Sequence, residues 1–240
     1  MMTHSFSEQT VMIAGAGGNL GSAVAKKFIS SGANLVLIDN REGKFERIFP
    51  ELIQSEQHLL AEGVDVNKKP LIESIAEDAL KKYNRLDVLV NAVGGYQGGF
   101  PLYETPEDAW DLLFEVNVRT VYNLCSVIAP IMVESKSGNI INIAARAGLK
   151  GRANSAAYSA AKSSVIRLTE ALAAELKHDG VTVNCILPGT IDTPQNRASM
   201  PNADYSRWPA PEDVANVILF LASNDAKVIT GASIPVYGRS

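Results

Sequence analysis

The sequence predicts an α/β fold, in which residues 1–240 form one domain around a doubly wound parallel sheet of about seven strands with helices on both faces. Short apolar segments alternate with helical segments from one end of the chain to the other, and this alternation predicts parallel strands joined by helices. No repeat or linker divides the chain. A hydrophobic content of 46% with 20% charged residues is typical of an ordinary globular protein.

The first predicted strand starts near Thr10 and runs into a glycine-rich turn, which a helical pattern follows as far as Gly32. Glycines allow the backbone to turn tightly and to approach a pyrophosphate, whose charge the helix N-terminus attracts. A simple tight turn is the alternative, but the strand–turn–helix context favours a phosphate loop. The candidate phosphate-binding residues are Gly15, Gly17, Gly18, Asn19, Leu20 and Gly21.

The second predicted strand ends in Asp39, 18 residues beyond Gly21. An acid at this place suits the ribose diol of NAD and repels the extra phosphate of NADP, although it also suits a turn or a helix cap. Arg41 lies close enough to soften that preference. The sequence therefore predicts NAD(H) as the preferred cofactor and leaves NADP(H) open.

The middle of the chain predicts a modest helix and a short strand within residues 40–62, then a helix over 69–83. A buried strand follows and runs into glycines. Asn91, Ala92 and Gly94 are expected at its carboxyl end, the edge at which open parallel sheets bind ligands. A strand-ending turn explains the same residues without a ligand.

A long helical pattern covers residues 105–129, with Thr105 as its expected cap and Pro130 as its expected stop. It contains Asn117 among apolar neighbours. A buried Asn must find hydrogen bonds, so Asn117 is either a structural tie or part of the site.

The next strand feeds an alanine-rich helix that is expected to reach about His178 and carries Tyr158 and Lys162. Residues four apart lie on one helix face, so an ammonium is expected beside a phenol. A nearby positive charge lowers the pKa of a phenol and prepares it for proton exchange. The alternative is a half-buried Tyr above a Lys whose ammonium reaches solvent.

The last third predicts a strand that meets Pro188 and Gly189, then a polar, irregular segment at about 190–210. Such a segment is a natural lid or substrate loop. A helix over about 211–223 and a strand near 232–236 complete the pattern.

The net charge is −4 and no basic cluster is present, which argues against nucleic acid or a membrane surface as a partner. No apolar run approaches about 18 residues, and no signal peptide is evident, so we expect a cytoplasmic protein. Cys125 and Cys185 are expected as buried thiols, although spacing alone does not exclude a disulfide. The histidines (His4, His58 and His178) have no ligand spacing, and we predict no metal site.

Taken together, these motifs resemble the short-chain dehydrogenase/reductase family over essentially the whole chain. The markers occur in family order: the glycine turn, Asn91 to Gly94, Asn117, the Tyr158/Lys162 pair, and Pro188-Gly189 with Thr193 following. The resemblance implies a Rossmann-type domain, an NAD(P)-dependent oxidoreductase acting on a small molecule, and a homodimer or homotetramer packed through the long helices.

The resemblance also implies roles for residues. Tyr158 is the expected proton donor or acceptor, Lys162 contacts the nicotinamide ribose, and Asn117 supports a proton-relay water. Besides Tyr158, Lys162 and the phosphate turn, the implied cofactor-binding residues are Asp39, Asp65, Val66, Asn91, Ala92, Gly94, Pro188, Gly189, Ile191 and Thr193.

The chain departs from the family at Ala145, thirteen residues before Tyr158, where members usually carry a serine that polarises the substrate carbonyl. Ser155 is a possible replacement, but a Ser just before a helix more often acts as an N-cap. The candidate substrate residues are Tyr96, Ala145, Arg146, Ser155, Asn196 and Trp208.

Residues 191–208 are similar to the substrate loop of one family branch, quinonoid dihydropteridine reductase, and residues 94–99 resemble its glycine-rich segment. That branch also has alanine at the serine position and prefers NADH. A quinonoid dihydropterin is therefore the expected acceptor, because an electron-poor conjugated ring needs no carbonyl polarisation. An ordinary carbonyl/alcohol oxidoreductase and a non-catalytic NAD(H)-binding regulator remain alternatives.

Overall fold

The computed structural model describes residues 5–239, so His4 lies outside the described part of the chain. At its centre is a seven-stranded sheet in the order β3-β2-β1-β4-β5-β6-β7, and each neighbouring pair is parallel. The strands are β1 (Thr10–Ala14), β2 (Asn34–Ile38), β3 (Leu59–Ala61), β4 (Val88–Asn91), β5 (Gly138–Ile143), β6 (Val181–Pro188) and β7 (Ser233–Val236).

Strand β1 shows why the central strands read as continuous apolar runs. All five of its residues are buried. Met12 and Ala14 pack into one hydrophobic cluster, whereas Val11 and Ile13 pack into another on the opposite face. Both faces of a parallel sheet are covered, so no polar alternation is required.

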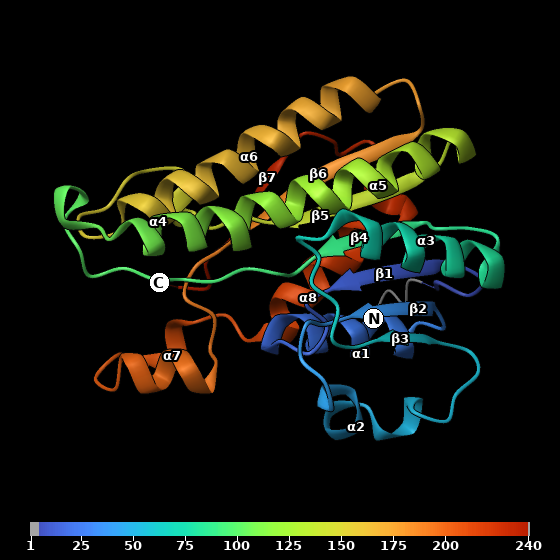
Figure 1. The fold of residues 1–240 in the computed structure, drawn as a ribbon, viewed down its shortest axis with the longest axis horizontal. Helices are drawn as coiled ribbons and strands as arrows, with labels where there is room; N and C mark the ends of the chain where they lie inside the picture. The colour runs from blue at the N-terminus through green and yellow to red at the C-terminus, as the bar shows by residue number, and fades with distance from the viewer. Residues whose placement is uncertain (1–4, 240) are drawn as a thin grey trace.

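Helices cover both faces of the sheet, as the sequence predicts (Figure 1). Helices α3, α5 and α6 supply one cluster, and α1 and α8 supply the other. The helices are α1 (Asn19–Ser30), α2 (Lys44–Ile48), α3 (Lys69–Tyr83), α4 (Glu107–Phe114), α5 (Thr120–Ser135), α6 (Ala156–Leu176), α7 (Pro194–Ser199) and α8 (Pro211–Leu221).

The strand order reverses direction between β1 and β4, which are adjacent in the sheet. Because every strand is parallel, all carboxyl ends lie at one edge, and a crevice opens where the order reverses. The segments after β1, β2, β4, β5 and β6 therefore meet at this edge. They carry most of the residues that the sequence analysis assigns to the site.

The helical stretch that includes Asn117 differs from its prediction at both ends. Thr105 does not cap it, because α4 begins after Pro106 and the Thr105 hydroxyl donates to the carbonyl of Pro101 instead. Pro130 does not stop it, because α5 continues to Ser135. Pro130 lies on the exposed side of α5, where the carbonyl that loses its helical partner can bind water.

Residues Glu107–Ser135 are the one stretch among the described helices that is long and apolar enough to cross a membrane. Half of its most apolar window is buried inside the fold, so this is weak evidence for a membrane span. The same stretch supplies core residues that pack against α3 and α6. Cys125 of α5 and Cys185 of β6 are both buried and free, so the two thiols are not joined.

Candidate active site

The glycine turn after β1 is shaped by two close approaches. Gly15 has φ +79°, and a Cβ there would lie 3.0 Å from the backbone of Ala92, beyond the end of β4. A Cβ at Gly17 would lie 2.7 Å from Oδ2 of Asp39. The turn therefore sits directly on the ends of β4 and β2, which only glycine permits.

The N-terminus of α1 is open for an anion. Its N-cap is Gly18, which has no side chain to satisfy the first N–H groups, and no acidic residue lies in the first turn. Unsatisfied N–H groups at a helix start attract phosphate. This arrangement fits the pyrophosphate of a dinucleotide. The N–H groups that would bind it belong to Asn19, Leu20 and Gly21.

Asp39 follows β2 and is almost fully buried. Its carboxylate accepts hydrogen bonds from the Gly17 N–H (2.9 Å), from the Arg41 N–H (3.1 Å), and from Nε (2.8 Å) and Nη2 (3.0 Å) of Arg41. Burial raises the pKa of Asp39, but the Arg41 and Gly17 hydrogen bonds outweigh it, and the pKa is lowered overall. Asp39 is thus an ionised acceptor that Arg41 covers.

A buried asparagine on α5, Asn123, holds the Asp65–Val66 turn. Nδ2 of Asn123, on α5, donates to the carbonyls of Val66 (3.0 Å) and Asn67 (2.9 Å), and Asp65 Oδ1 accepts from the Asn67 N–H (3.0 Å). The sequence analysis did not single out Asn123. The pattern that indicated Asn117, an asparagine within an apolar helical stretch, would also have identified Asn123.

The side chain of Asn91 is buried on the face of the sheet that α5 covers. Its Nδ2 donates to Oδ1 of Asn142 on β5 (2.6 Å), and its own Oδ1 has no hydrogen-bond partner. Asn91 therefore ties β4 to β5. Beyond it, a Cβ at Gly94 would lie 3.0 Å from Asn117 Oδ1 and 3.2 Å from Lys162 Nζ, which shows how closely three predicted site residues converge.

Asn117 is fully buried in a π-helical turn (Glu115–Arg119) between α4 and α5. Its Oδ1 accepts from the Gly95 N–H (3.2 Å), and its Nδ2 donates to the carbonyls of Gly95 (3.0 Å) and Leu113 (2.9 Å). Asn117 thereby clamps the loop after β4 from both sides. The structure shows that Asn117 is a structural tie, and its part in the site stays a prediction.

Tyr158 and Lys162 lie on one face of α6, as their spacing predicts. Lys162 is buried and its Nζ donates to the carbonyl of Ile143 at the end of β5 (2.7 Å). The same Nζ lies 6.0 Å from the centre of the Tyr158 ring. Tyr96 packs edge-on against Tyr158, with ring centres 4.9 Å apart and planes at 84°.

The prediction that Lys162 lowers the pKa of Tyr158 is wrong for this structure. Burial, with a smaller contribution from Tyr96, raises the pKa of Tyr158 to about 12. Burial also lowers the pKa of Lys162 to about 8. The ammonium is directed at the Ile143 carbonyl, so desolvation of the phenol dominates. Tyr158 is consequently protonated at neutral pH and suited to donate a proton.

Ala145 follows β5, two residues beyond the carbonyl that holds Lys162. It is buried and offers no hydroxyl. Ser155 occupies the N-cap position of α6, but its side chain makes no capping hydrogen bond, so the prediction of a capping serine is wrong. Ser155 instead lines a small hollow together with Gln97 and Asn154.

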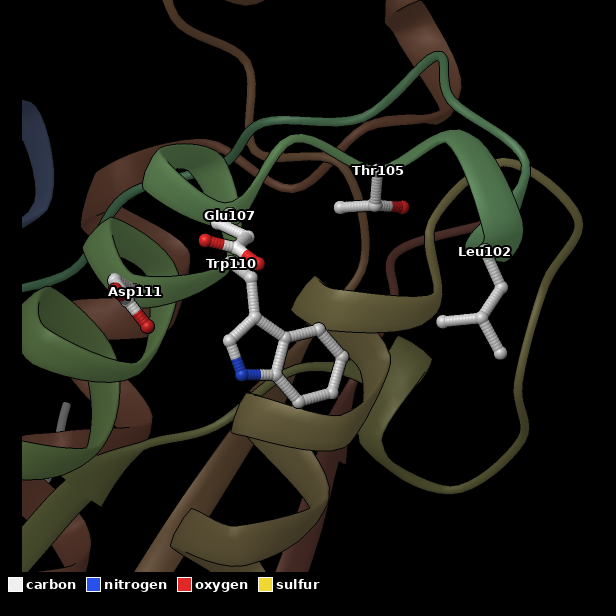
Figure 2. A pocket seen from close by; sticks show the side chains of 5 residues that line it. All are labelled: Leu102, Thr105, Glu107, Trp110 and Asp111. Atoms are coloured by element: carbon white, nitrogen blue, oxygen red, sulfur yellow. The ribbon is translucent and has the colours of Figure 1, made fainter.

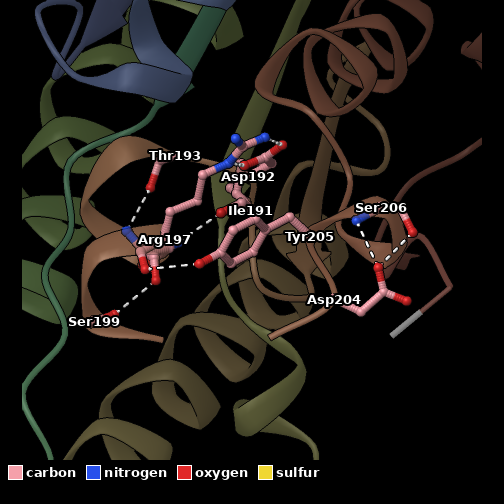
Figure 3. A network of polar contacts seen from close by, with 9 residues as sticks. Ile191, Asp192, Thr193, Arg197, Ser199, Asp204, Tyr205 and Ser206 are labelled. Carbon is pink, nitrogen blue, oxygen red and sulfur yellow. Dashed lines mark hydrogen bonds and ion pairs between the residues drawn. The ribbon is translucent and has the colours of Figure 1, made fainter. Parts of the chain in front are cut away.

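The segment after β6 is more ordered than the sequence analysis expects. It contains α7 and a 3-10 turn, η5 (Tyr205–Arg207), joined by the polar network in Figure 3. Thr193 caps α7 by accepting from the Asn196 N–H, and Asn196 Nδ2 donates to the carbonyl of Ile191 (2.8 Å). Among the earlier residues of the segment, the Gly189 N–H donates to Val236 (3.1 Å), which fixes the turn after Pro188 to β7.

Two predicted substrate residues lie at the margin of this region. Trp208 packs against Tyr205, with ring centres 5.0 Å apart. The Arg146 guanidinium lies 4.9 Å from the centre of the Tyr237 ring. A separate surface hollow of about 410 Å³ lies between a 3-10 turn (Leu102–Glu104) and α4 (Figure 2). Trp110 is one of the residues that line it. None of its lining residues belongs to the predicted site.

A glycine turn, an ionised acid after β2, a half-buried Tyr158 and a buried Lys162 meet at the carboxyl edge of the sheet, as expected of a nucleotide-dependent oxidoreductase. The short chain dehydrogenase family model matches residues 9–204. This chain belongs to that family and is an NAD(P)-dependent short-chain dehydrogenase/reductase.

Curated relatives match along nearly their whole length. The chain is 34% identical over 239 residues to the (2S)-[(R)-hydroxy(phenyl)methyl]succinyl-CoA dehydrogenase subunit BbsD of Thauera aromatica, covering 96% of this chain and 95% of the relative. It is also 34% identical over 241 residues to meso-2,3-butanediol dehydrogenase of Serratia marcescens, covering 97% and 94%.

Solved structures agree in fold. A short-chain type dehydrogenase/reductase from Mycobacterium ulcerans superposes with a TM-score of 0.90 at 26% identity, covering 98% of this chain and 90% of the other. ElxO with NADP bound superposes with a TM-score of 0.87 at 27% identity, covering 96% and 97%.

Proposed function

We propose that this enzyme uses NADH to reduce a planar, conjugated small molecule, with a quinonoid dihydropterin as the first candidate acceptor. The observation that carries the proposal is Ala145. It lies beside the Tyr158/Lys162 pair without a hydroxyl. An acceptor that is already electron-poor needs no donor to polarise a carbonyl, so the missing hydroxyl costs it little.

The residues of this chain have defined tasks in such a reaction. When bound, NADH would supply a hydride, which carries the two electrons that the acceptor needs. Tyr158 donates the phenolic proton that completes the reduction, since its raised pKa keeps it protonated. Tyr96 is 69% exposed and stands edge-on to Tyr158, so its ring forms an apolar wall for a flat acceptor.

The preference for NADH rests on Asp39, whose lowered pKa keeps a negative charge where the ribose binds. Arg41 covers that carboxylate, so a ribose diol must share or displace its hydrogen bonds. We expect Asp39→Ala to narrow the ratio of kcat/KM for NADH to that for NADPH. An unchanged ratio would show that another group reads the ribose.

The deciding experiment measures NADH oxidation with a freshly generated quinonoid dihydropterin and, separately, with simple ketones. Fast turnover of the pterin alone supports the proposal. Tyr158→Phe is the control, because it removes only the proton donor. It should abolish turnover and leave NADH affinity, measured by fluorescence titration, nearly unchanged.

A carbonyl/alcohol oxidoreductase is the second candidate, and Ser155 favours it. Its side chain makes no capping hydrogen bond, and Ser155, although buried, lines a small hollow beside Gln97. Ketone reduction without pterin turnover, lost in Ser155→Ala at unchanged stability, would establish this candidate. NADH binding with neither activity would instead indicate an NAD(H)-binding regulator.

A further inference from the structure

The segment after β6, residues 190–210, is called the lid below. It is stabilised by contacts among its own residues. Arg197 forms a two-pronged ion pair with Asp192 (2.5 and 2.7 Å) and lies 4.8 Å from the centre of the Tyr205 ring. The Asp192 N–H donates to the carbonyl of Pro209 (2.9 Å), which joins the two ends of the segment at a closed neck. Figure 3 shows how these contacts link α7 to η5.

One side-chain hydrogen bond connects this unit to the phosphate turn. Nδ2 of Asn19, the first residue of α1, donates to Oε1 of Gln195, the second residue of α7 (2.8 Å). Asn19 stands within the cofactor-binding turn, and Gln195 lies two residues beyond Thr193. Both partners are exposed, so the bond is formed at the rim rather than in the core.

The strand order shows which part of the sheet the Asn19–Gln195 hydrogen bond spans. Strands β1 and β6, which lead to Asn19 and Gln195, are separated in the sheet by β4 and β5. At about 4.8 Å per strand the two starting points are roughly 14 Å apart. A direct contact between the segments therefore bridges the ends of β4 and β5, where Gly94 and Ala145 lie.

We propose that Asn19 and Gln195 form a latch that holds the lid over the bound dinucleotide and slows its release. Breaking one exposed hydrogen bond between neutral groups should raise the dissociation rate of NADH about two- to tenfold. The proposal concerns the cofactor only and does not depend on the acceptor. It can therefore fail while the proposed reaction stands, and the reverse also holds.

Stopped-flow fluorescence measures the release of NADH from Asn19→Gly, Gln195→Ala and the double variant. A shared bond predicts that each single change accelerates release and that the double change adds little more, because the interaction can be lost only once. Exchanging the partners, Asn19→Gln with Gln195→Asn, keeps one donor, one acceptor and the combined length, and should restore slow release.

Ser199→Ala is the matched control, since the Ser199 hydroxyl bonds within α7 to the carbonyl of Asn196 (3.0 Å) and does not reach α1. It should leave the release of NADH unchanged. Unchanged release in both single variants, additive effects in the double variant, or no restoration in the exchanged pair would each overturn the latch.

Hydrogen exchange provides a second measurement that needs no cofactor. Asn19→Gly should accelerate amide exchange in α7, far away in the sequence, while the amides of α3 keep their protection. If the latch also limits turnover through product release, kcat rises together with KM for NADH. Unaltered exchange in α7 would show that Asn19 does not hold the lid.

Discussion

Ala145 is the residue at which this enzyme departs from its family, and its neighbours make the consequence specific. The buried Lys162 is held by the carbonyl two residues before Ala145, so the alanine methyl lies at the reaction edge. Tyr158 and Lys162, to which the family resemblance assigns proton donation, are present, whereas Ala145 offers no hydroxyl.

We expect Ala145→Ser to raise kcat/KM for ketones by about 10²-fold, the loss measured when one such donor is removed from an enzyme. Reduction of a conjugated acceptor should change much less. The measurement compares both substrates in steady-state assays with NADH, and Ala144→Ser tests whether a hydroxyl one residue earlier suffices. Equal gains for both acceptors would contradict the assigned role of Ala145.

Lys162 carries a cost to stability that depends on pH. Burial depresses its pKa in the folded state from 10.5 to about 8, so the folded protein pays for a buried ammonium at neutral pH. The contribution of Lys162 is most favourable above pH 10.5, where the amine is neutral in both states. It is lost as the pH falls through about 8.

Lys162→Met removes this charge while keeping an unbranched apolar side chain. The gain in the free energy of unfolding of the variant over the wild type should be about 2–3 kcal/mol larger at pH 7 than at pH 10.5. Urea denaturation at both pH values measures this difference. A difference that does not vary with pH would mean that the ammonium is not desolvated.

At the scale of elements, two asparagines hold segments at the carboxyl edge of the sheet, Asn117 from the π-helical turn between α4 and α5 and Asn123 from α5. Asn117 binds the loop after β4, which carries Tyr96 towards Tyr158. Asn123 binds the turn after β3, at Val66 and Asn67. Both side chains are buried and both use Nδ2 to hold two carbonyls.

The two asparagines form a matched pair for mutagenesis. Asn117→Ala and Asn123→Ala should each lower the free energy of unfolding by about 2–4 kcal/mol, because buried carbonyls lose their donor. Asn117→Ala should chiefly lower kcat, whereas Asn123→Ala should chiefly raise the Kd for NADH. Equal effects on kcat and Kd in both variants would show a general loss of structure rather than separate roles for Asn117 and Asn123.

At the scale of the whole molecule, helices α4, α5 and α6 each carry exposed apolar side chains. Trp110, Leu112, Tyr122 and Leu168 are each 36–53% exposed there. Apolar side chains gathered on neighbouring helices favour association. The packing of a homodimer or homotetramer through the long helices stays a prediction.

We expect the protein to sediment as a dimer or tetramer and Leu112→Glu to reduce its mass in solution, because a charge would be buried between subunits. Val228→Glu is the control. Val228 is 83% exposed but lies outside these helices, so its substitution should leave the mass unchanged. A monomeric wild type would rule out the predicted assembly.

The architecture was predictable because its signals are local. The buried runs of β1 and β4, the helix over Lys69–Tyr83 and the glycines at 15 and 17 each reflect requirements met within a few residues. Three predictions about helix ends were wrong: that Thr105 caps a helix, that Pro130 stops one, and that the Ser155 side chain caps α6. At those ends the local preference competed with packing or solvent exposure, and tertiary context prevailed.

The sequence alone determined the fold, the cofactor class and the absence of a hydroxyl at Ala145, because periodicity, glycine spacing and residue identity are properties of the chain itself. Only the tertiary structure decided that Arg41 covers Asp39, that Asn117 clamps Gly95 and that burial raises the pKa of Tyr158. These features depend on which groups meet and how much water remains around them. Solvation and contact between distant segments exist only once the chain has folded.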